Sequence, residues 1–371
     1  LRAHALSLPA LAPVAGPAIL AMLSLTAAVN AFAGPLVEDA RAWTPIAPAG
    51  ATRCLDGSAY TFFHRAGAAG APKRLVVEFE GGGACWDVLT CTVGTYTNAE
   101  VDVDHKLREL NKAEGVHSST DVRNPFKDWD HVFVPYCTAD AHGGNHSKDY
   151  GIKTVHHVGR VNALAALDYA FKAVAAPTLT ATIGCSAGSL GAVINAPYVM
   201  SQYPSVRSFT FHDSYVGVLS RYQFSEAVKN WHLQFSPSIP ALAPAELERV
   251  AADDSVDPGH YMLNSTLAAM GEEHRFAFYT SDKDLVQRSF FALGGNLTNW
   301  TAAMRTLLGR LHAAYPAAQY STFIASGEHH CRMTDDSIYK TSAKGVNLGG
   351  WMGRVVAGNL TDDDARVDCC A

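Results

Sequence analysis

The sequence predicts an α/β protein in which helices cover both faces of a mostly parallel central sheet. First, short apolar runs recur along the chain, and each breaks into glycine and polar residues at its carboxyl end. Second, helical patterns stand between these runs, and strands that alternate with helices form parallel sheets. Third, 48% of the 371 residues are hydrophobic and no fixed-period repeat occurs, so that one large core can form.

Six apolar runs are expected to form the strands. The first starts at Leu75 in RLVVEFEGGGACW, and the last lies in YSTFIASGEHHC. Between them, the expected strands cover residues 131–135, 178–183, 208–211 and 275–280. The expected helices cover residues 159–176, 188–203, 297–315 and 349–359, with a helical excursion over residues 216–267.

The N-terminal region has the pattern of a secretory leader. Arg2 and His4 precede a long uncharged run that ends in small residues around Ala33. We therefore expect a signal peptide over residues 1–33, a single domain over residues 34–371, and a secreted or extracytoplasmic protein with no stable membrane insertion. The alternative is an uncleaved anchor, because the uncharged run is long enough to span a bilayer, although three prolines interrupt it.

Cysteine content and charge narrow the function classes. All eight cysteines lie beyond the predicted leader, and an even number in an exported chain indicates disulfides; buried free thiols are the alternative. Lysine and arginine number 29 against 35 acidic residues, and the net charge is −6. No nucleic-acid partner is expected from this balance.

The stretch TIGCSAGSLGA places Ser186 in a G-x-S-x-G motif between an expected strand and an expected helix. This strand-turn-helix context is the one in which a serine projects above the sheet as a nucleophile. The alternative is a glycine-rich turn without chemistry. The motif favours an α/β-hydrolase-like catalytic domain.

A serine nucleophile needs a histidine base and an acid, in the chain order Ser, acid, His for this architecture. The loop SGEHHC after the last expected strand offers His329 or His330 as the base. The end of the preceding strand offers Asp282 and Asp284 as the acid, with Asp213 as a weaker rival.

Acyl transfer also requires hydrogen-bond donors for the oxyanion. The backbone N–H groups of Gly82 and Gly83, in the glycine run EGGGACW, and of Ala187 are the candidates. A metal site would rest on Asp140, His142 and His146, but their loop is too rich in glycine for a metal-binding helix. Neither phosphate-binding glycine motif occurs, and we expect no metal and no cofactor.

The ordered segments EGGGACW, VPYCTADAHGGN, GCSAGSLGA, HDSYVG, SDKDLVQ and SGEHHC resemble the motifs of the pectin acetylesterase family, which includes the Notum carboxylesterases. The resemblance implies that Ser186 is the nucleophile and His330 the base. It implies Asp284 as the acid, because the family reads Asp-x-x-Gln at that place. It also assigns the oxyanion positions to Gly82, Gly83 and Ala187.

The resemblance and the serine motif together predict a secreted serine carboxylesterase that forms an acyl-enzyme. The implied substrate is an acylated polysaccharide, such as acetylated pectin, or another ester. We expect the protein to be a monomer. One alternative is a Notum-like deacylase of a lipidated protein. The other is a secreted binding protein that kept the fold and lost the chemistry.

Overall fold

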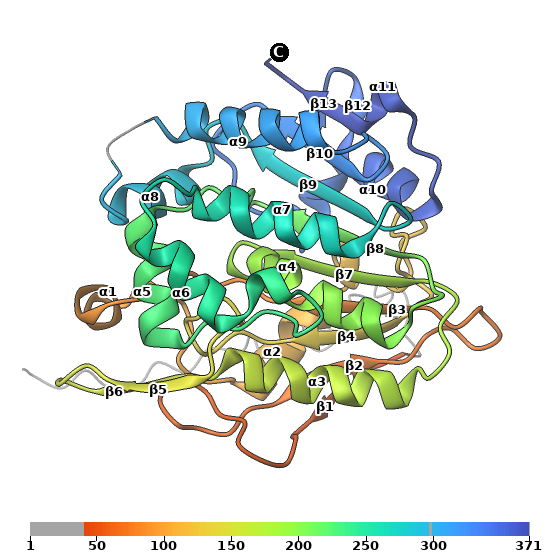
Figure 1. Ribbon diagram of the computed structural model, residues 1–371. Coiled ribbons are helices and arrows are strands. Elements are labelled where there is room, and N and C mark those ends of the chain that lie inside the picture. Colours follow the sequence, from red (N-terminus) through yellow and green to blue (C-terminus); the bar gives the residue numbers. More distant parts are fainter. Residues whose placement is uncertain (1–40, 297–298, 371) are drawn as a thin grey trace, which may run out of the picture. The chain divides into compact units, whose positions relative to one another are not determined.

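A nine-stranded sheet forms the centre of the part of the chain that the computed structural model describes, residues 41–296 and 299–370 (Figure 1). The strand order is β1-β2-β4-β3-β7-β8-β9-β10-β13. The seven strands from β4 to β13 are parallel, whereas β1 and β2 extend one edge in antiparallel fashion. The predicted leader, residues 1–33, lies outside the described residues.

The strands of this sheet are β1 Thr44–Ile46, β2 Phe62–Arg65, β3 Leu75–Phe79, β4 Asp130–Val134, β7 Thr180–Cys185, β8 Ser208–Asp213, β9 Arg275–Ser281, β10 Tyr320–Ala325 and β13 Arg366–Asp368. Two small antiparallel pairs stand apart from it, namely β5 His146–Asp149 with β6 Thr154–His157, and β11 Ser342–Ala343 with β12 Val346–Asn347.

Helices cover both faces of the sheet, as Figure 1 shows for α3, α4, α7 and α9 on the near face. The α-helices are α1 Val88–Val93, α2 Val103–Leu110, α3 Gly159–Ala173, α4 Ala187–Gln202, α5 Arg221–Trp231, α6 Pro244–Ala252, α7 Pro258–Met270, α8 Leu285–Leu293, α9 Trp300–Ala314, α10 Leu348–Ala357 and α11 Asp362–Ala365. Short 3-10 helices cover Gly115–His117, Pro240–Leu242 and Asp336–Tyr339.

Alternation along the strands supplies a core on each side of the sheet. In β9, Phe276 and Phe278 pack into the cluster with α4, α7 and α9, whereas Ala277 and Tyr279 pack into the cluster with α10. Successive residues of a strand point to opposite faces, so a strand buried on both sides must be apolar throughout. This explains why the strand signals in the sequence are continuous apolar runs.

Parallel pairing brings the predicted site segments to one edge of the sheet. β7 and β8 end level, with Cys185 opposite Asp213, and β9 and β10 end level, with Ser281 opposite Ala325. The chain segments that leave these four strands therefore start side by side. One of them is the turn that carries Ser186.

The predicted α/β class with a mostly parallel sheet is confirmed. Each of the six expected strands is present, with shifts of one or two residues at the ends, and the helices expected over residues 159–176, 188–203 and 349–359 are α3, α4 and α10. Helix α9 begins at Trp300, inside the expected range, and residues 297–298 lie outside the described ones. The excursion contains α5, α6 and α7. The sequence patterns did not predict the short strands β1, β2 and β13 of the sheet, the β5–β6 and β11–β12 pairs, or helices α1, α2, α8 and α11.

The predicted disulfides are confirmed, and the free-thiol alternative was wrong. The bonds join Cys54 to Cys137, Cys85 to Cys91, Cys185 to Cys331 and Cys369 to Cys370, which accounts for all eight cysteines. Within residues 41–296 and 299–370, the helices lack the combination of length and apolar character that crossing a bilayer requires.

Buried histidines make the fold sensitive to acid. Burial lowers the pKa of His142 to about 4 and that of His157 and His212 to about 3. In the unfolded chain these side chains would take up a proton near their ordinary pKa of about 6.5. The unfolded state therefore binds more protons below that pH, and their contribution to stability, complete above about pH 6.5, is lost as the pH falls toward the folded-state values.

We predict that the free energy of unfolding falls by about 1.4 kcal/mol per histidine for each pH unit below pH 6.5, measured by urea denaturation at pH 7 and pH 5. In the variant His212→Gln, one proton fewer is taken up on unfolding, so the free energy of unfolding should change less between pH 7 and pH 5. An equal pH dependence of the parent protein and of His212→Gln would contradict the prediction.

Candidate active site

Ser186 occupies a strained turn between β7 and α4. Its backbone has φ 56° and ψ −123°, a conformation that residues with a side chain rarely adopt. The N–H of Ser186 donates a 2.8 Å hydrogen bond to the carbonyl oxygen of Asp213 at the end of β8. This is the geometry of a nucleophile elbow, in which the serine stands above the end of its strand.

Close backbone contacts explain the glycines of the motif. A Cβ atom on Gly184 would overlap the carbonyl oxygen of Gly188, and one on Gly188 would overlap the carbonyl oxygen of Phe79 in the neighbouring strand. A Cβ atom on Gly81 would lie 2.5 Å from the carbonyl oxygen of Cys185. The turn can therefore close only when these positions carry glycine.

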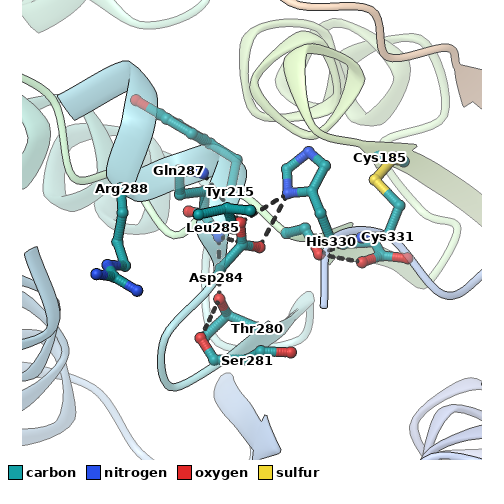
Figure 2. A network of polar contacts seen from close by, with 12 residues as sticks. Cys185, Tyr215, Thr280, Ser281, Asp284, Leu285, Gln287, Arg288, His330 and Cys331 are labelled. Atoms are coloured by element: carbon teal, nitrogen blue, oxygen red, sulfur yellow. Dashed lines mark hydrogen bonds and ion pairs between the residues drawn. A yellow bond between two sulfur atoms is a disulfide. The ribbon is translucent and has the colours of Figure 1, made fainter. Parts of the chain in front are cut away.

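His330 and Asp284 form a hydrogen-bonded pair (Figure 2). The His330 Nδ1 atom lies 2.9 and 3.0 Å from the two carboxylate oxygens of Asp284. Since an ionised carboxylate can only accept, Nδ1 carries the proton and Nε2 is left with a free lone pair. His330 Nε2 is buried and makes no hydrogen bond within the described part of the chain.

Asp284 is held rigidly at the start of α8. It is fully buried and caps the helix, accepting a 2.9 Å hydrogen bond from the backbone N–H of Gln287. The Gln287 side-chain amide donates a second bond of 3.0 Å to the other carboxylate oxygen. These two donors fix the carboxylate toward His330 and explain the Asp-x-x-Gln spacing in the sequence.

Neither Asp282 nor His329 joins this pair. The carboxylate of Asp282 accepts a 2.8 Å hydrogen bond from the N–H of Gly327 and so braces the loop that carries the histidines. His329 is an exposed residue of that loop. The alternatives that the residue pattern left open are thus separated by contacts, which favour Asp284 and His330.

Asp213, the rival acid, contacts the backbone beyond His330 instead of its ring. Its Oδ2 atom accepts hydrogen bonds of 2.6 and 2.7 Å from the N–H groups of Arg332 and Met333. The neighbouring Ser214 hydroxyl donates to the Asp213 carboxylate and accepts from the N–H of Cys331. Burial raises the pKa of Asp213, and the bonds from these donors oppose that rise.

A disulfide ties the two halves of the site together. Cys185 precedes Ser186 and Cys331 follows His330, and these two cysteines are bonded across 146 residues of sequence (Figure 2). The sequence did not indicate a partner for Cys185. The signal that could have predicted the pairing is that one cysteine stands directly beside the predicted nucleophile and another directly beside the predicted base.

Of the predicted oxyanion donors, Gly82 and Gly83 line the same cavity as Ser186, and Ala187 directly follows Ser186 in the chain. The N–H of Ala84 donates to the carbonyl oxygen of Thr95, and the N–H of Thr97 donates to the carbonyl oxygen of Gly82. Gly83 lies between these two bonds, opposite Tyr96, so its own N–H points away from the Thr95–Thr97 segment. Ala187 is the first residue of α4, where a backbone N–H has no acceptor within the helix.

Two cavities meet at Ser186 and His330. One is an open cleft of about 810 Å³, the more polar of the two, and Gly82 and Gly83 line it. The other is an apolar pocket of about 110 Å³, whose lining includes the aromatic side chains Trp86, Phe224, Trp231, Phe290 and Phe291. The site therefore offers two chemically different compartments, and Ser186 lines both of them.

The three candidate metal ligands are engaged separately. Asp140 accepts hydrogen bonds from Thr138 and from the N–H of Gly159, and burial raises its pKa to about 7. The His142 Nε2 atom lies 2.8 Å from the carbonyl oxygen of Glu80, while His146 stacks on His232 with ring centroids 3.9 Å apart. These contacts give the loop a structural role beside the sheet.

The family model described as Pectinacetylesterase matches residues 39–220, which include the predicted nucleophile and oxyanion positions. The resemblance to the pectin acetylesterase family is confirmed. Pectin acetylesterase 11 of Arabidopsis thaliana is 28% identical over a region that covers 41% of this chain and 39% of that protein. The palmitoleoyl-protein carboxylesterase NOTUM of Schmidtea mediterranea is 28% identical over 38% of this chain and 27% of that protein.

A solved structure extends the comparison to the C-terminal half. The Wnt deacylase Notum from Drosophila superposes with a TM-score of 0.62 and 17% identity, covering 86% of this chain and 94% of the other. At this identity the match shows the fold, which is that of the Notum-like α/β-hydrolases. The chain spans less than half of the length of the curated pectin acetylesterases and NOTUM that it matches.

We predict that Asp284→Asn lowers the turnover of p-nitrophenyl acetate by about 10⁴-fold, because an amide cannot hold the histidine in the required tautomer. Asp282→Asn is the matched control on the same loop and should lose less than tenfold, since an amide oxygen still accepts the bond from Gly327. Comparable losses in both variants would show that the acid is assigned wrongly.

We predict that Asp213→Asn lowers the free energy of unfolding by about 2 kcal/mol, the scale of a hydrogen bond to a buried charged group. Turnover should fall by less than in Asp284→Asn, because Asp213 positions the loop and does not touch the imidazole. Denaturation and steady-state rates measure the two effects. The control is Asp257→Asn at the start of α7. It should leave stability and turnover nearly unchanged, because asparagine caps a helix as well as aspartate does. A full 10⁴-fold loss in Asp213→Asn would assign the acid role to Asp213.

Proposed function

We propose that the protein is a secreted serine carboxylesterase that forms an acyl-enzyme at Ser186. The observation that carries the proposal is the bond of Asp284 to His330 Nδ1, which leaves His330 Nε2 unoccupied at the two cavities that Ser186 also lines. An imidazole with a free Nε2 next to an elbow serine is equipped to remove the hydroxyl proton.

In the proposed reaction, His330 Nε2 takes the proton from Ser186 Oγ as this oxygen attacks the ester carbonyl carbon. The oxyanion receives hydrogen bonds from the N–H groups of Gly82, Gly83 and Ala187, and Asp284 stabilises the imidazolium. Collapse of the intermediate breaks the bond to the alcohol oxygen, which leaves with the proton from His330. Water then attacks the acyl-serine by the same steps in reverse roles and releases the carboxylic acid.

The two compartments support a division of the substrate. An apolar pocket stabilises the hydrocarbon part of an acyl group, whereas an open polar cleft suits an alcohol that carries hydroxyl groups. We therefore propose that the enzyme removes small acyl groups, acetyl first, from a polysaccharide, in line with the names of the matched pectin acetylesterases.

The apolar lining of the pocket is the observation behind a second candidate, a deacylase for longer acyl chains, whose acyl group would have to extend beyond the pocket volume of about 110 Å³. Its wall is built from aromatic and aliphatic side chains such as Trp86, Leu190, Phe224 and Phe290, more apolar surface than an acetyl group needs. NOTUM of Schmidtea mediterranea, by its name, removes palmitoleoyl groups from protein. Both candidates use the same three catalytic side chains.

The proposed setting is extracytoplasmic. Four disulfides, among them the bond beside the catalytic candidates, persist in oxidising compartments. A cleaved leader over residues 1–33, followed by one catalytic domain that acts as a monomer, agrees with that setting.

We predict that the purified protein hydrolyses p-nitrophenyl acetate and that a fluorophosphonate probe labels Ser186. Ser186→Ala should abolish both, whereas Ser201→Ala, at an exposed position of the same helix, should change neither. An unlabelled and inactive parent protein would favour the binding-protein alternative. A series of acetyl, octanoyl and palmitoleoyl esters then separates the two esterases, because a kcat/KM that rises with chain length would exclude the deacetylase.

A further inference from the structure

The polar cleft beside Ser186 is strongly acidic. An adjoining hollow of about 720 Å³ shares Glu80, Thr97, Lys106 and Glu109 with it, so that the two form a continuous lined surface. Together they are lined by eight carboxylates and two lysines. The formal charge of this lining is therefore −6 with histidines neutral, as large as the net charge of the whole chain.

The carboxylates at the base of the cleft are paired with neighbouring histidine and lysine side chains. Glu78 lies under the floor of the cleft, where His117 and His131 bond its carboxylate at 2.8 to 3.0 Å. Lys106 bridges Glu80 at 2.5 Å and Glu109 at 2.7 Å. Since one lysine serves two carboxylates, this trio still carries a negative charge and has no cation to spare for a substrate.

The exposed rim adds uncompensated charge. Glu100 and Glu114 are exposed, and within the described part of the chain their side chains make no hydrogen bond or ion pair. Asp102 and Asp335 also line the hollows while capping helices. Lys112 is the second of the two lysines in the lining and is outnumbered by these four carboxylates.

The position of this charge identifies what it acts on. The proposed function places the acyl group in the apolar pocket, which leaves the acidic cleft, also lined by Ser186, for the alcohol part of the ester. At physiological ionic strength charges act over about 8 Å, and the walls of a cleft lie within that range of a bound chain. A ligand with many carboxylates would meet like charge along its whole length.

We infer that the cleft selects esters whose alcohol part is a neutral or cationic saccharide and disfavours binding of a polyuronate chain. The inference rests on the proposed function and specifies its substrate class. Within the acylated polysaccharides, it favours an acetylated neutral or amino-sugar glycan over pectin with free carboxylates.

The test compares three oligosaccharides of matched length and equal content of O-acetyl esters, namely a xylan, a polygalacturonate and a chitosan whose amino groups are free. At low salt we expect kcat/KM for the polygalacturonate to be about tenfold or more below that for the xylan. Raising the ionic strength from about 20 mM to about 300 mM should increase the rate on the polygalacturonate several-fold, lower it on the chitosan and leave the xylan unchanged.

The double variant Glu100→Gln, Glu114→Gln removes two rim charges without breaking a bond in the described structure. It should raise kcat/KM for the polygalacturonate several-fold relative to the xylan. Glu272→Gln is the matched control and should have no effect. It lies in the exposed turn before β9, at the amino ends of the parallel strands and therefore away from the site. Equal or faster hydrolysis of the polygalacturonate at low salt, by a protein that hydrolyses p-nitrophenyl acetate, would overturn the inference. Failure on p-nitrophenyl acetate would instead count against the esterase itself.

Discussion

The candidate site depends on the hydrogen bonds of the Asp213–Ser214 segment, which joins the serine turn to the histidine loop. The Asp213 carbonyl oxygen accepts from the N–H of Ser186, while its carboxylate and the Ser214 hydroxyl hold the three backbone N–H groups that follow His330. A loop without secondary structure thereby gains the fixed position that a proton-transferring base requires. The Cys185–Cys331 disulfide restrains the same two segments by a covalent route.

The parallel sheet creates the conditions for this arrangement. Strands that end level deliver their loops to one edge, but a nucleophile is exposed there only if its turn is tight enough to lift the side chain out of the sheet. The glycines at 184 and 188 permit that turn, because backbone atoms occupy the space where Cβ atoms would stand. The strain at Ser186 is sustained by the regular structure on either side of it.

The sequence predicted the features that are encoded locally. Continuous apolar runs indicated the central strands, and the motif around Ser186 indicated the turn, since both depend on residues close together in the chain. The choice between Asp282 and Asp284 depends instead on which carboxylate faces His330, 46 residues beyond Asp284. The partner of Cys185 and the role of Asp213 likewise depend on contacts between distant loops. The short edge strands β1 and β13 were also not predicted, because three residues carry too little periodicity to identify a strand.

The unlike character of the two cavities bears on the order of events in the proposed reaction. After the first step the acyl group is bonded to Ser186 and the alcohol must leave before water can attack. An apolar pocket retains the acyl part, while the open cleft lets the alcohol diffuse away and admits water along the same path to His330. A negatively charged cleft also weakens rebinding of any product that exposes a carboxylate, so release of the acid after deacylation is favoured by the same surface that selects the alcohol. On the proposed assignment of the two cavities, the charge that restricts the substrate range would therefore also favour release of the acid.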